Sequence, residues 1–146
     1  MNFLDALNAS ATGLSAQRLR MNLIASNLAN VNTPQAKEGK AYHRKDAVFA
    51  AKTPESDFGD ALARHLHPGL NGVQVVAIRD DERPPILKYD PTHPDANEEG
   101  FISLPNINVV EEMVNMISAS RSYEANVTAV KASKDMAGSA LDIGKA

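Results

Sequence analysis

The last quarter of the chain carries the strongest constraint on folding, a row of residues with a period close to 3.5. The row advances by alternating steps of four and three through Val109, Met113, Met116, Ser120, Tyr123, Val127, Val130, Lys134, Ala137 and Leu141. This period is typical of the narrow seam along which one helix packs against another. Asn108 suits an N-cap, and Glu111 can complete a capping box with it. We therefore predict one helix from about residue 108 to Gly144, roughly 50 Å long at 1.5 Å per residue.

The first thirty residues predict a second amphipathic helix, from residue 3 to about residue 30. Leu7, Leu14, Met21 and Leu28 recur at strict intervals of seven. Many other positions are Ala or Ser, whereas a solvated helix face is normally charged, so we expect further helices to approach on several sides. Gly13 interrupts the pattern and indicates a bend or a close helix contact, because glycine in a helix costs up to about 1 kcal/mol relative to alanine.

An Asn-rich segment ends this first helix. Pro34 allows no comfortable continuation, and Asn side chains can satisfy the exposed backbone groups of a helix end. Asn27 and Asn30 are three residues apart, which places two amides on one face. Two interpretations stay open for Ser26, Asn27, Ala29 and Asn30: a plain helix cap, or a specific contact with another subunit.

The middle of the chain predicts a small β-rich insert. An extended segment is expected at 42–49 and strands at 73–78, 86–89 and 101–104, with a turn at Asn71-Gly72 and a short helical turn near 60–65. The fold class is therefore α+β: two long amphipathic terminal helices pack as a coiled coil, with a small β-rich insert between them in the chain. We divide the chain into an N-terminal helix with its Asn-rich cap (1–34), the insert (35–104) and a C-terminal helix (105–146).

Bulk composition excludes several classes of protein. The net charge is −3 and no block of Lys or Arg occurs, which argues against nucleic acid as the main partner. The chain has no cysteine, so disulfides and thiolate metal ligands are impossible. No apolar run approaches the roughly 20 residues of a transmembrane helix. No cationic start leads into a shorter apolar run, so we expect neither membrane insertion nor a cleaved signal peptide.

The densest group of potential metal ligands is Asp90–Glu99. Asp95, Asn97 and Glu99 imitate the start of a calcium loop, but Asn106 stands where that loop needs a bidentate Glu. A solvated turn is the favoured interpretation. His65 and His67 lack a third ligand nearby, and no nucleophile, phosphate-loop or zinc-protease motif occurs. We predict no catalytic residue, no metal site and no cofactor.

The two helices instead predict assembly. A buried Leu, Met or Val stabilises by roughly 1.5–3 kcal/mol over its exposed state. Within one molecule the two arms share a single interface, so their remaining faces would stay wet unless neighbours cover them. That favours a polymerising subunit whose arms order on assembly. We expect subunit interfaces at seam residues of both helices: Leu7, Leu14, Met21, Leu28, Met113, Met116, Tyr123, Val127 and Val130.

Three stretches of the chain resemble the rod and hook axial proteins of the bacterial flagellum. They are residues 14–30, residues 89–106 and residues 110–126, and the resemblance extends over nearly the whole chain. The family signature falls on Ser26, Asn27, Ala29, Asn30 and Thr33. In many members Thr-Pro is followed by Gly and an aromatic residue, whereas here a longer loop leads from Pro34 to Tyr42. This loop resembles the proximal-rod type and argues against the distal-rod and hook types.

The resemblance implies a structural subunit of the proximal rod in the flagellar basal body. Such a subunit polymerises through its terminal helices into a hollow, torque-transmitting drive shaft for motility. The implied partners are copies of itself, other rod proteins, the rod–ring adaptor FliE and the flagellar type III export apparatus. The implied location is the periplasmic part of the rod, reached without a cleaved signal. Two alternatives stay open: a soluble coiled-coil adaptor, and a metal-binding module at Asp90–Glu99.

Overall fold

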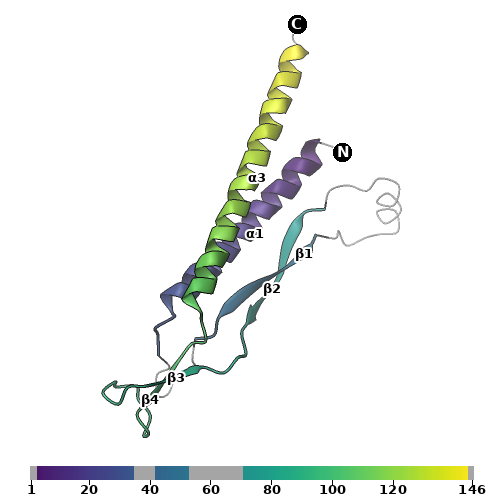
Figure 1. Cartoon of the computed structure of the whole chain (residues 1–146). Coiled ribbons are helices and arrows are strands. Elements are labelled where there is room, and N and C mark those ends of the chain that lie inside the picture. The colour runs from purple at the N-terminus through teal and green to yellow at the C-terminus, as the bar shows by residue number, and fades with distance from the viewer. Residues whose placement is uncertain (1–2, 35–41, 53–70, 145–146) are drawn as a thin grey trace, which may run out of the picture.

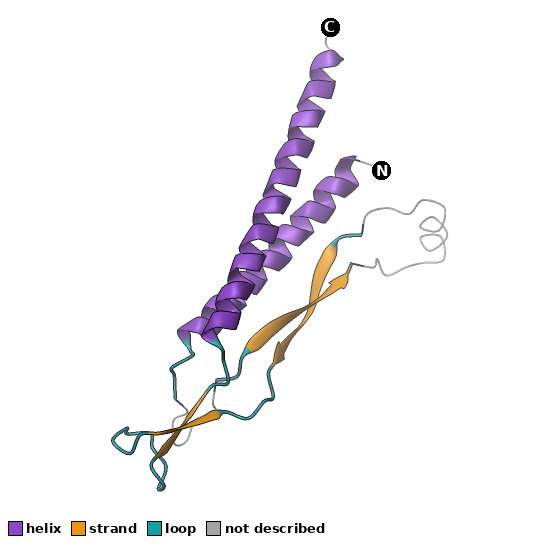
Figure 2. Ribbon diagram, in the orientation of Figure 1, coloured by secondary structure: helices purple, strands orange, loops and turns teal. Residues whose placement is uncertain are grey.

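The computed structural model describes residues 3–34, 42–52 and 71–144. The elements follow in the order α1 (Phe3–Ala29), β1 (Lys45–Ala51), β2 (Val73–Asp80), β3 (Ile86–Tyr89), β4 (Phe101–Leu104) and α3 (Val109–Ile143). The two helices lie side by side and antiparallel, and α3 extends beyond the start of α1 (Figure 1). Strands β1 and β2 lie beside α1, and strands β3 and β4 lie below both helices (Figure 2). This arrangement confirms the predicted α+β fold with paired terminal helices.

The face of α3 that is covered within the molecule differs from the predicted seam. Its covered residues again advance by steps of four and three: Glu112, Met116, Ala119, Tyr123, Asn126, Val130, Ser133 and Ala137. Met116, Tyr123, Val130 and Ala137 belong to the predicted row. At the other positions the covered row is shifted by one residue. Glu112, Asn126 and Ser133 are covered where the predicted row has the exposed Met113, Val127 and Lys134, and Ala119 is buried next to the half-buried Ser120. Small side chains are favoured on this face because they allow the two helix backbones to approach closely.

Gly13 of α1 marks one such close approach. A Cβ atom at Gly13 would lie 3.1 Å from Nδ2 of Asn126, a side chain of α3. Asn126 is held in place by its own helix, since its Nδ2 donates to the carbonyl oxygen of Ser122 at 3.0 Å. Of the two possibilities predicted for Gly13, a bend or a close helix contact, the structure shows the close contact.

The start of α3 is capped as predicted by Asn108. Its Oδ1 atom accepts hydrogen bonds from the amides of Val110, at 3.0 Å, and Glu111, at 3.4 Å. Glu111 and Glu112 lie in the first turn, where negative charge interacts favourably with the helix dipole. The cap thus fixes the point at which the chain leaves the insert and enters the second arm.

Strands β1 and β2 form an antiparallel pair that runs along α1. The pairing extends from Lys45 opposite Asp80 to Ala51 opposite Val73, with an irregularity between Val48 and Phe49. The amide of Val73 donates to Oγ1 of Thr12 at 3.0 Å, which attaches the far end of the pair to the middle of α1. Compared with the predicted extended segment 42–49, strand β1 begins three residues later and ends two residues later, so residues 42–44 lie before the strand. The helical turn predicted near residues 60–65 lies outside the described residues.

Strands β3 and β4 form a second antiparallel pair, with Tyr89 opposite Phe101 and Ile86 opposite Leu104. The rings of Tyr89 and Phe101 pack edge to face, with their centroids 5.3 Å apart. Gly100 has φ of 81°, and a Cβ atom there would lie 3.0 Å from Cε2 of Tyr89. A residue without a side chain is therefore needed to turn the loop back onto β3.

The sequence pointed to one small sheet, whereas the described residues contain two sheets of two strands each. The tight return at Gly100 pairs β4 with β3, so β2 pairs with β1 instead. Among the described helices and strands, β3 and β4 contact only each other. The β3–β4 hairpin is therefore an appendage of the helical shaft.

The core is thin. Among the described residues, the buried apolar side chains are Ala16 and Ile24 of α1, Ala119 of α3, and Ala96, Ile102 and Ile107 in or beside the β3–β4 hairpin. Within the described part of the chain, no helix is long and apolar enough to span a membrane. With so little apolar core, polar contacts must define how the three parts of the molecule meet.

Candidate assembly site

Asn27 is the centre of a buried polar network. Its side chain is 0 % exposed. Nδ2 donates to the carbonyl oxygen of Lys45 and to Oε2 of Glu112, both at 2.9 Å. Oδ1 accepts from the Lys45 amide and from the Tyr42 hydroxyl, also at 2.9 Å. The amide therefore uses its full capacity of two donors and two acceptor sites, as a buried polar group requires.

Glu112 closes this network with a buried ion pair. The carboxylate is 1 % exposed, and Arg44 Nε donates to its Oε1 atom at 2.8 Å. An ionised carboxylate is costly to bury unless it is paired and hydrogen-bonded, and here both oxygens are satisfied. We call Asn27, Tyr42, Arg44, Lys45 and Glu112 the Asn27 clasp. It joins the end of α1, the segment leading into β1 and the start of α3.

The other signature residues surround the clasp with local contacts. Asn30 Nδ2 donates to the Ser26 carbonyl oxygen at 2.8 Å, which is a helix-capping bond. Ser26 Oγ lies 3.1 Å from the Tyr42 hydroxyl, and Thr33 Oγ1 lies 3.4 Å from Asn30 Oδ1. Ala29 is exposed. The capping interpretation thus fits Asn30, while Asn27 connects distant parts of its own chain.

Sequence reasoning missed the partners of Asn27. The sequence patterns place Arg44 in the extended segment 42–49 and assign no contact to Glu112. The contact between Asn27 and Glu112 spans 85 residues of sequence. The available signal was weak: an Asn pair at one helix end and an acidic pair at the start of the other helix.

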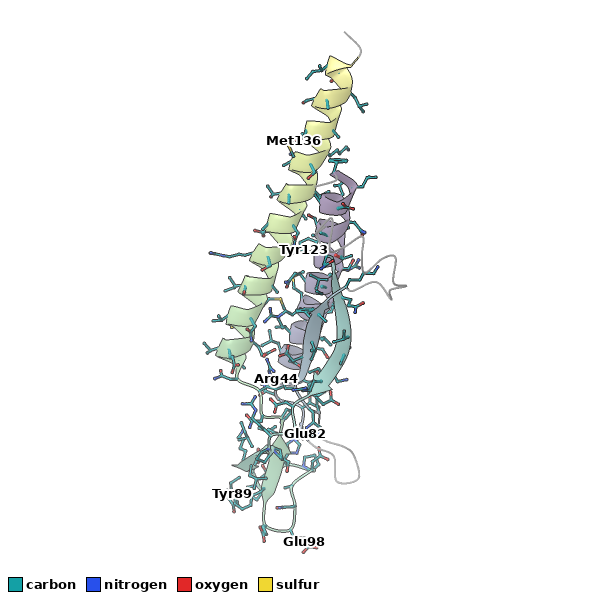
Figure 3. The ribbon with its side chains drawn as sticks, turned by 90° about the vertical axis from the view of Figure 1, so that its right-hand side faces the viewer. Arg44, Glu82, Tyr89, Glu98, Tyr123 and Met136 are labelled. Atoms are coloured by element: carbon teal, nitrogen blue, oxygen red, sulfur yellow. The ribbon has the colours of Figure 1, made fainter. Side chains whose placement is uncertain are left out.

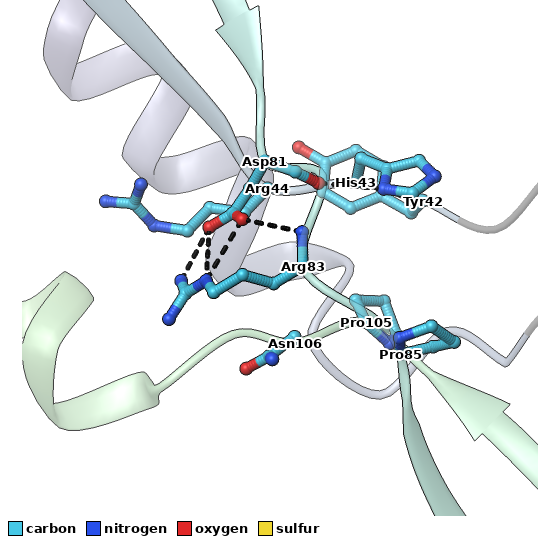
Figure 4. A pocket seen from close by; sticks show the side chains of 8 residues that line it. All are labelled: Tyr42, His43, Arg44, Asp81, Arg83, Pro85, Pro105 and Asn106. Carbon is cyan, nitrogen blue, oxygen red and sulfur yellow. Dashed lines mark hydrogen bonds and ion pairs between the residues drawn. The ribbon is translucent and has the colours of Figure 1, made fainter.

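A second polar site lies between the β1–β2 pair and the β3–β4 hairpin. Tyr42, His43 and Arg44 face Asp81, Arg83, Pro85, Pro105 and Asn106 across a small hollow (Figure 4). The Arg83 side chain and backbone amide both donate to the Asp81 carboxylate, which lowers the pKa of Asp81 from 3.8 to about 2. The same pairing raises the pKa of Arg83. The end of β2 is therefore held in a fixed turn before β3 begins.

The outward side of α3 carries an exposed apolar row. Val110, Met113, Val114 and Ile117 are all more than half exposed, and Ile117 is 55 % exposed. Their spacing of three, four and seven places them on one face, and that face lies opposite the side covered by α1. We call these four residues the α3 stripe. Contiguous exposed apolar surface of this kind is a candidate interaction site.

A second apolar surface lies near the chain ends. Phe3 and Ala6 of α1 form a groove with the last turns of α3, at Met136, Ala137 and Leu141. Figure 3 shows Met136 near the free end of α3, at the end of the molecule opposite Tyr89. The molecule thus exposes apolar surface at both ends of its helical shaft.

The residues predicted for subunit interfaces divide between two environments. Met113 and Val127 are exposed. The others are half-buried against neighbouring elements of their own chain: Leu7, Leu14, Met21, Leu28, Met116, Tyr123 and Val130. Their role between subunits stays a prediction.

The side chains of Asp90–Glu99 form turns instead of a ligand cage. Asp90 accepts from the Thr92 hydroxyl, and His93 Nδ1 accepts from the Asp95 amide. Asn97 Oδ1 accepts from the amides of Glu99 and Phe101. Across residues 3–34, 42–52 and 71–144, no three His, Asp or Glu side chains gather as a metal site. The acidic loop is therefore organised by its own backbone.

Comparison with known families assigns a class to this architecture. Residues 7–37 match the family described as "Flagella basal body rod protein". Residues 98–143 match the family described as "Flagellar basal body rod FlgEFG protein C-terminal". The two matches fall on the two helical arms, including Asn27 and Glu112. They define the class as rod proteins of the flagellar basal body.

Full-length relatives narrow the class further. The flagellar basal-body rod protein FlgC of Borreliella burgdorferi is 44 % identical, and the alignment covers 98 % of each chain. The FlgC proteins of Bacillus subtilis and Salmonella typhimurium are 42 % and 35 % identical, over 99 % of this chain and 100 % of each relative. The chain belongs to the FlgC family of flagellar basal-body rod proteins. It is a structural subunit of the proximal rod, as the resemblance implied.

Proposed function

We propose that this subunit polymerises through its terminal helices into the hollow, torque-transmitting shaft of the rod, and that the α3 stripe is a main contact between neighbours. One observation carries the proposal. Toward α1, half of the covered row of α3 consists of the small or polar residues Glu112, Ala119, Asn126 and Ser133. The large apolar residues of its first turns are exposed instead. A helix of this design serves a partner outside its own chain.

The energies favour a polymer over a free dimer. Full burial of four half-exposed apolar side chains would contribute on the order of 3–6 kcal/mol. Association costs an estimated 4–15 kcal/mol in lost translational and rotational freedom. One such contact therefore does not hold two free subunits together, whereas several simultaneous contacts in a helical array do.

The proposal includes a route and a set of neighbours. The chain is exported by the flagellar type III apparatus and joins the periplasmic part of the rod. Its neighbours there are copies of itself, other rod proteins and the rod–ring adaptor FliE. Residues 1–34 and 105–146 form the shaft, and residues 35–104 form the insert outside it. The role is structural, without catalysis or a cofactor.

Electron microscopy of basal bodies tests this function. Basal bodies are purified from a strain that lacks the gene, from its parent and from the complemented strain. We expect membrane rings without a rod, hook or filament in the deletion strain, and complete structures in the other two. Complete rods and hooks in the deletion strain would contradict a structural role and return the soluble adaptor to consideration.

A further inference from the structure

The β3–β4 hairpin has no use in the assembly described so far. It lies at the end of the molecule away from both chain termini (Figures 1 and 2), and among the described elements its strands contact only each other. A protruding hairpin that adds nothing to the helical core is a candidate for contact with another molecule. Its surface chemistry indicates which molecule.

One face of the hairpin is apolar and open. Leu87 is 63 % exposed and Tyr89 is 64 % exposed. Side chains two residues apart in a strand point to the same face, so Leu87 and Tyr89 share one side of β3. Phe101, which pairs with Tyr89 across the strands, extends that side. Ile86 and Lys88 point to the opposite side.

The same hairpin carries the net charge of the protein. Residues 84–108 contain one positive side chain, Lys88, and four negative ones, at Asp90, Asp95, Glu98 and Glu99, which gives −3. The whole chain also has a net charge of −3, so the remaining residues balance to zero. Glu98 and Glu99 are both exposed, and Glu98 lies at the tip of the molecule (Figure 3). The fitting partner surface is apolar with a basic neighbour.

The α3 stripe has this composition. Val114 and Ile117 are exposed, and Arg121 follows Ile117 by four residues on the same face of the helix. Arg121 and Lys131 are both exposed on this face, which also carries the exposed Glu124 and Asp135, and Arg121 is the charged residue of the face nearest to Ile117. The hairpin does not contact the α3 of its own chain, so a hairpin from another copy can occupy the stripe.

We propose that the β3–β4 hairpin of one copy docks on the α3 stripe of a second copy. Leu87 and Tyr89 cover Val114 and Ile117, and Glu98 and Glu99 face Arg121. This inference rests on the proposed function, because it assigns an occupant to the stripe. Two different patches meet, so the contact is heterologous: it passes from copy to copy, into a ring or an open helical array, and does not close as a two-fold dimer.

Engineered cysteines test the contact directly, because the natural chain has none. Leu87→Cys and Ile117→Cys are combined in one chain, basal bodies are purified, and the thiols are oxidised. A disulfide requires Cα atoms about 4.4–6.8 Å apart. We expect cross-linked pairs of subunits in denaturing gels. Ile86→Cys with Ile117→Cys is the matched control and should give no pairs, because Ile86 points to the other side of β3.

Each outcome of the cross-linking experiment decides a different point. Complete rods that contain the double-cysteine chain but yield no cross-linked pairs would overturn the docking proposal and leave the proposed function intact. Equal cross-linking by the Ile86 control would also overturn it. Failure of the proposed function would appear separately, as complete rods in the deletion strain.

If the cysteine variants do not assemble, exchanging the charges across the proposed contact provides a second test. Arg121→Glu alone, and Glu98→Lys with Glu99→Lys, should each reduce the swimming rate several-fold. All three changes in one chain should restore most of it. A triple variant no better than either parent would mean that the hairpin docks on a different rod protein, and the proposal would fall.

Discussion

At the scale of single residues, Asn27 shows why a rod protein with a thin core keeps a defined shape. Four hydrogen bonds of 2.9 Å fix one amide between a helix end, the approach to a strand and a buried carboxylate. Only an amide offers two donors and two acceptor sites in this geometry. Aspartate has nearly the same shape but no donors when ionised.

Asn27→Asp should therefore be among the most destabilising substitutions in the protein. It places a second carboxylate beside Glu112 and removes both donors, so we expect the free energy of unfolding to fall by about 3–5 kcal/mol. Urea denaturation followed by circular dichroism measures the loss. Asn22→Asp, on an exposed position of the same helix, is the control and should change stability by less than about 0.5 kcal/mol. Similar values for both variants would contradict the role of the Asn27 clasp.

Asp81 predicts a pH dependence of stability. Arg83 lowers the pKa of Asp81 in the folded protein to about 2, below its ordinary value of 3.8. The stabilisation is therefore complete above about pH 4 and is lost as the pH falls toward 2. We expect Asp81→Asn to lose less thermal stability than the wild type between pH 4 and pH 2. Asp80→Asn is the control. Equal losses of thermal stability in the wild type and in Asp81→Asn would show that the Asp81 carboxylate does not contribute to the pH dependence.

At the scale of elements, local patterns located the helices well and their contacts poorly. The predicted bounds of both helices and of β3 and β4 lie within about two residues of those observed, since periodicity and caps are local properties. The face of α3 that meets α1 is only half shared with the predicted seam, because apolarity favours Met113 and Val127 while the covered positions are Glu112 and Asn126. Close packing at Gly13 and the buried clasp decide that face, and both depend on residues far apart in sequence.

Gly13 allows a test of the close helix contact, with Gly138 as its natural control. A side chain at Gly13 meets Asn126, whereas nothing lies within 4 Å of a Cβ atom at Gly138. We expect Gly13→Leu to destabilise the helix pair by roughly 1–3 kcal/mol, as overpacking does. Gly138→Leu should be neutral or stabilise by up to about 1 kcal/mol through helix propensity. Thermal melting followed by circular dichroism measures both effects. Equal melting temperatures for the two variants would contradict the close helix contact at Gly13.

At the scale of the whole molecule, the subunit combines a small apolar core with several exposed apolar surfaces. The buried apolar residues are few, while the α3 stripe, the groove beside Phe3 and the open face of β3 all expose apolar side chains. The α3 stripe alone does not hold two free subunits together. The placement of these surfaces at different heights along the shaft suits simultaneous contact with several neighbours.

This balance predicts that the purified protein is a monomer at micromolar concentrations. The few kcal/mol available at the stripe do not repay the entropy of forming an isolated dimer. Analytical ultracentrifugation across a concentration series should give a single species near the 15.7 kDa of the chain. A stable dimer in that series would contradict the requirement for several neighbours.

The central claim is that the outward face of α3 serves other subunits and not its own chain. The most direct measurement is electron microscopy of basal bodies from a strain producing Ile117→Asp, together with circular dichroism of the purified variant. Ala129→Asp, on an exposed position of α3 outside the stripe, is the control. We predict that Ile117→Asp keeps wild-type helicity and melting but yields no complete rods, while the control assembles normally. Complete rods and normal swimming with Ile117→Asp would contradict the claim.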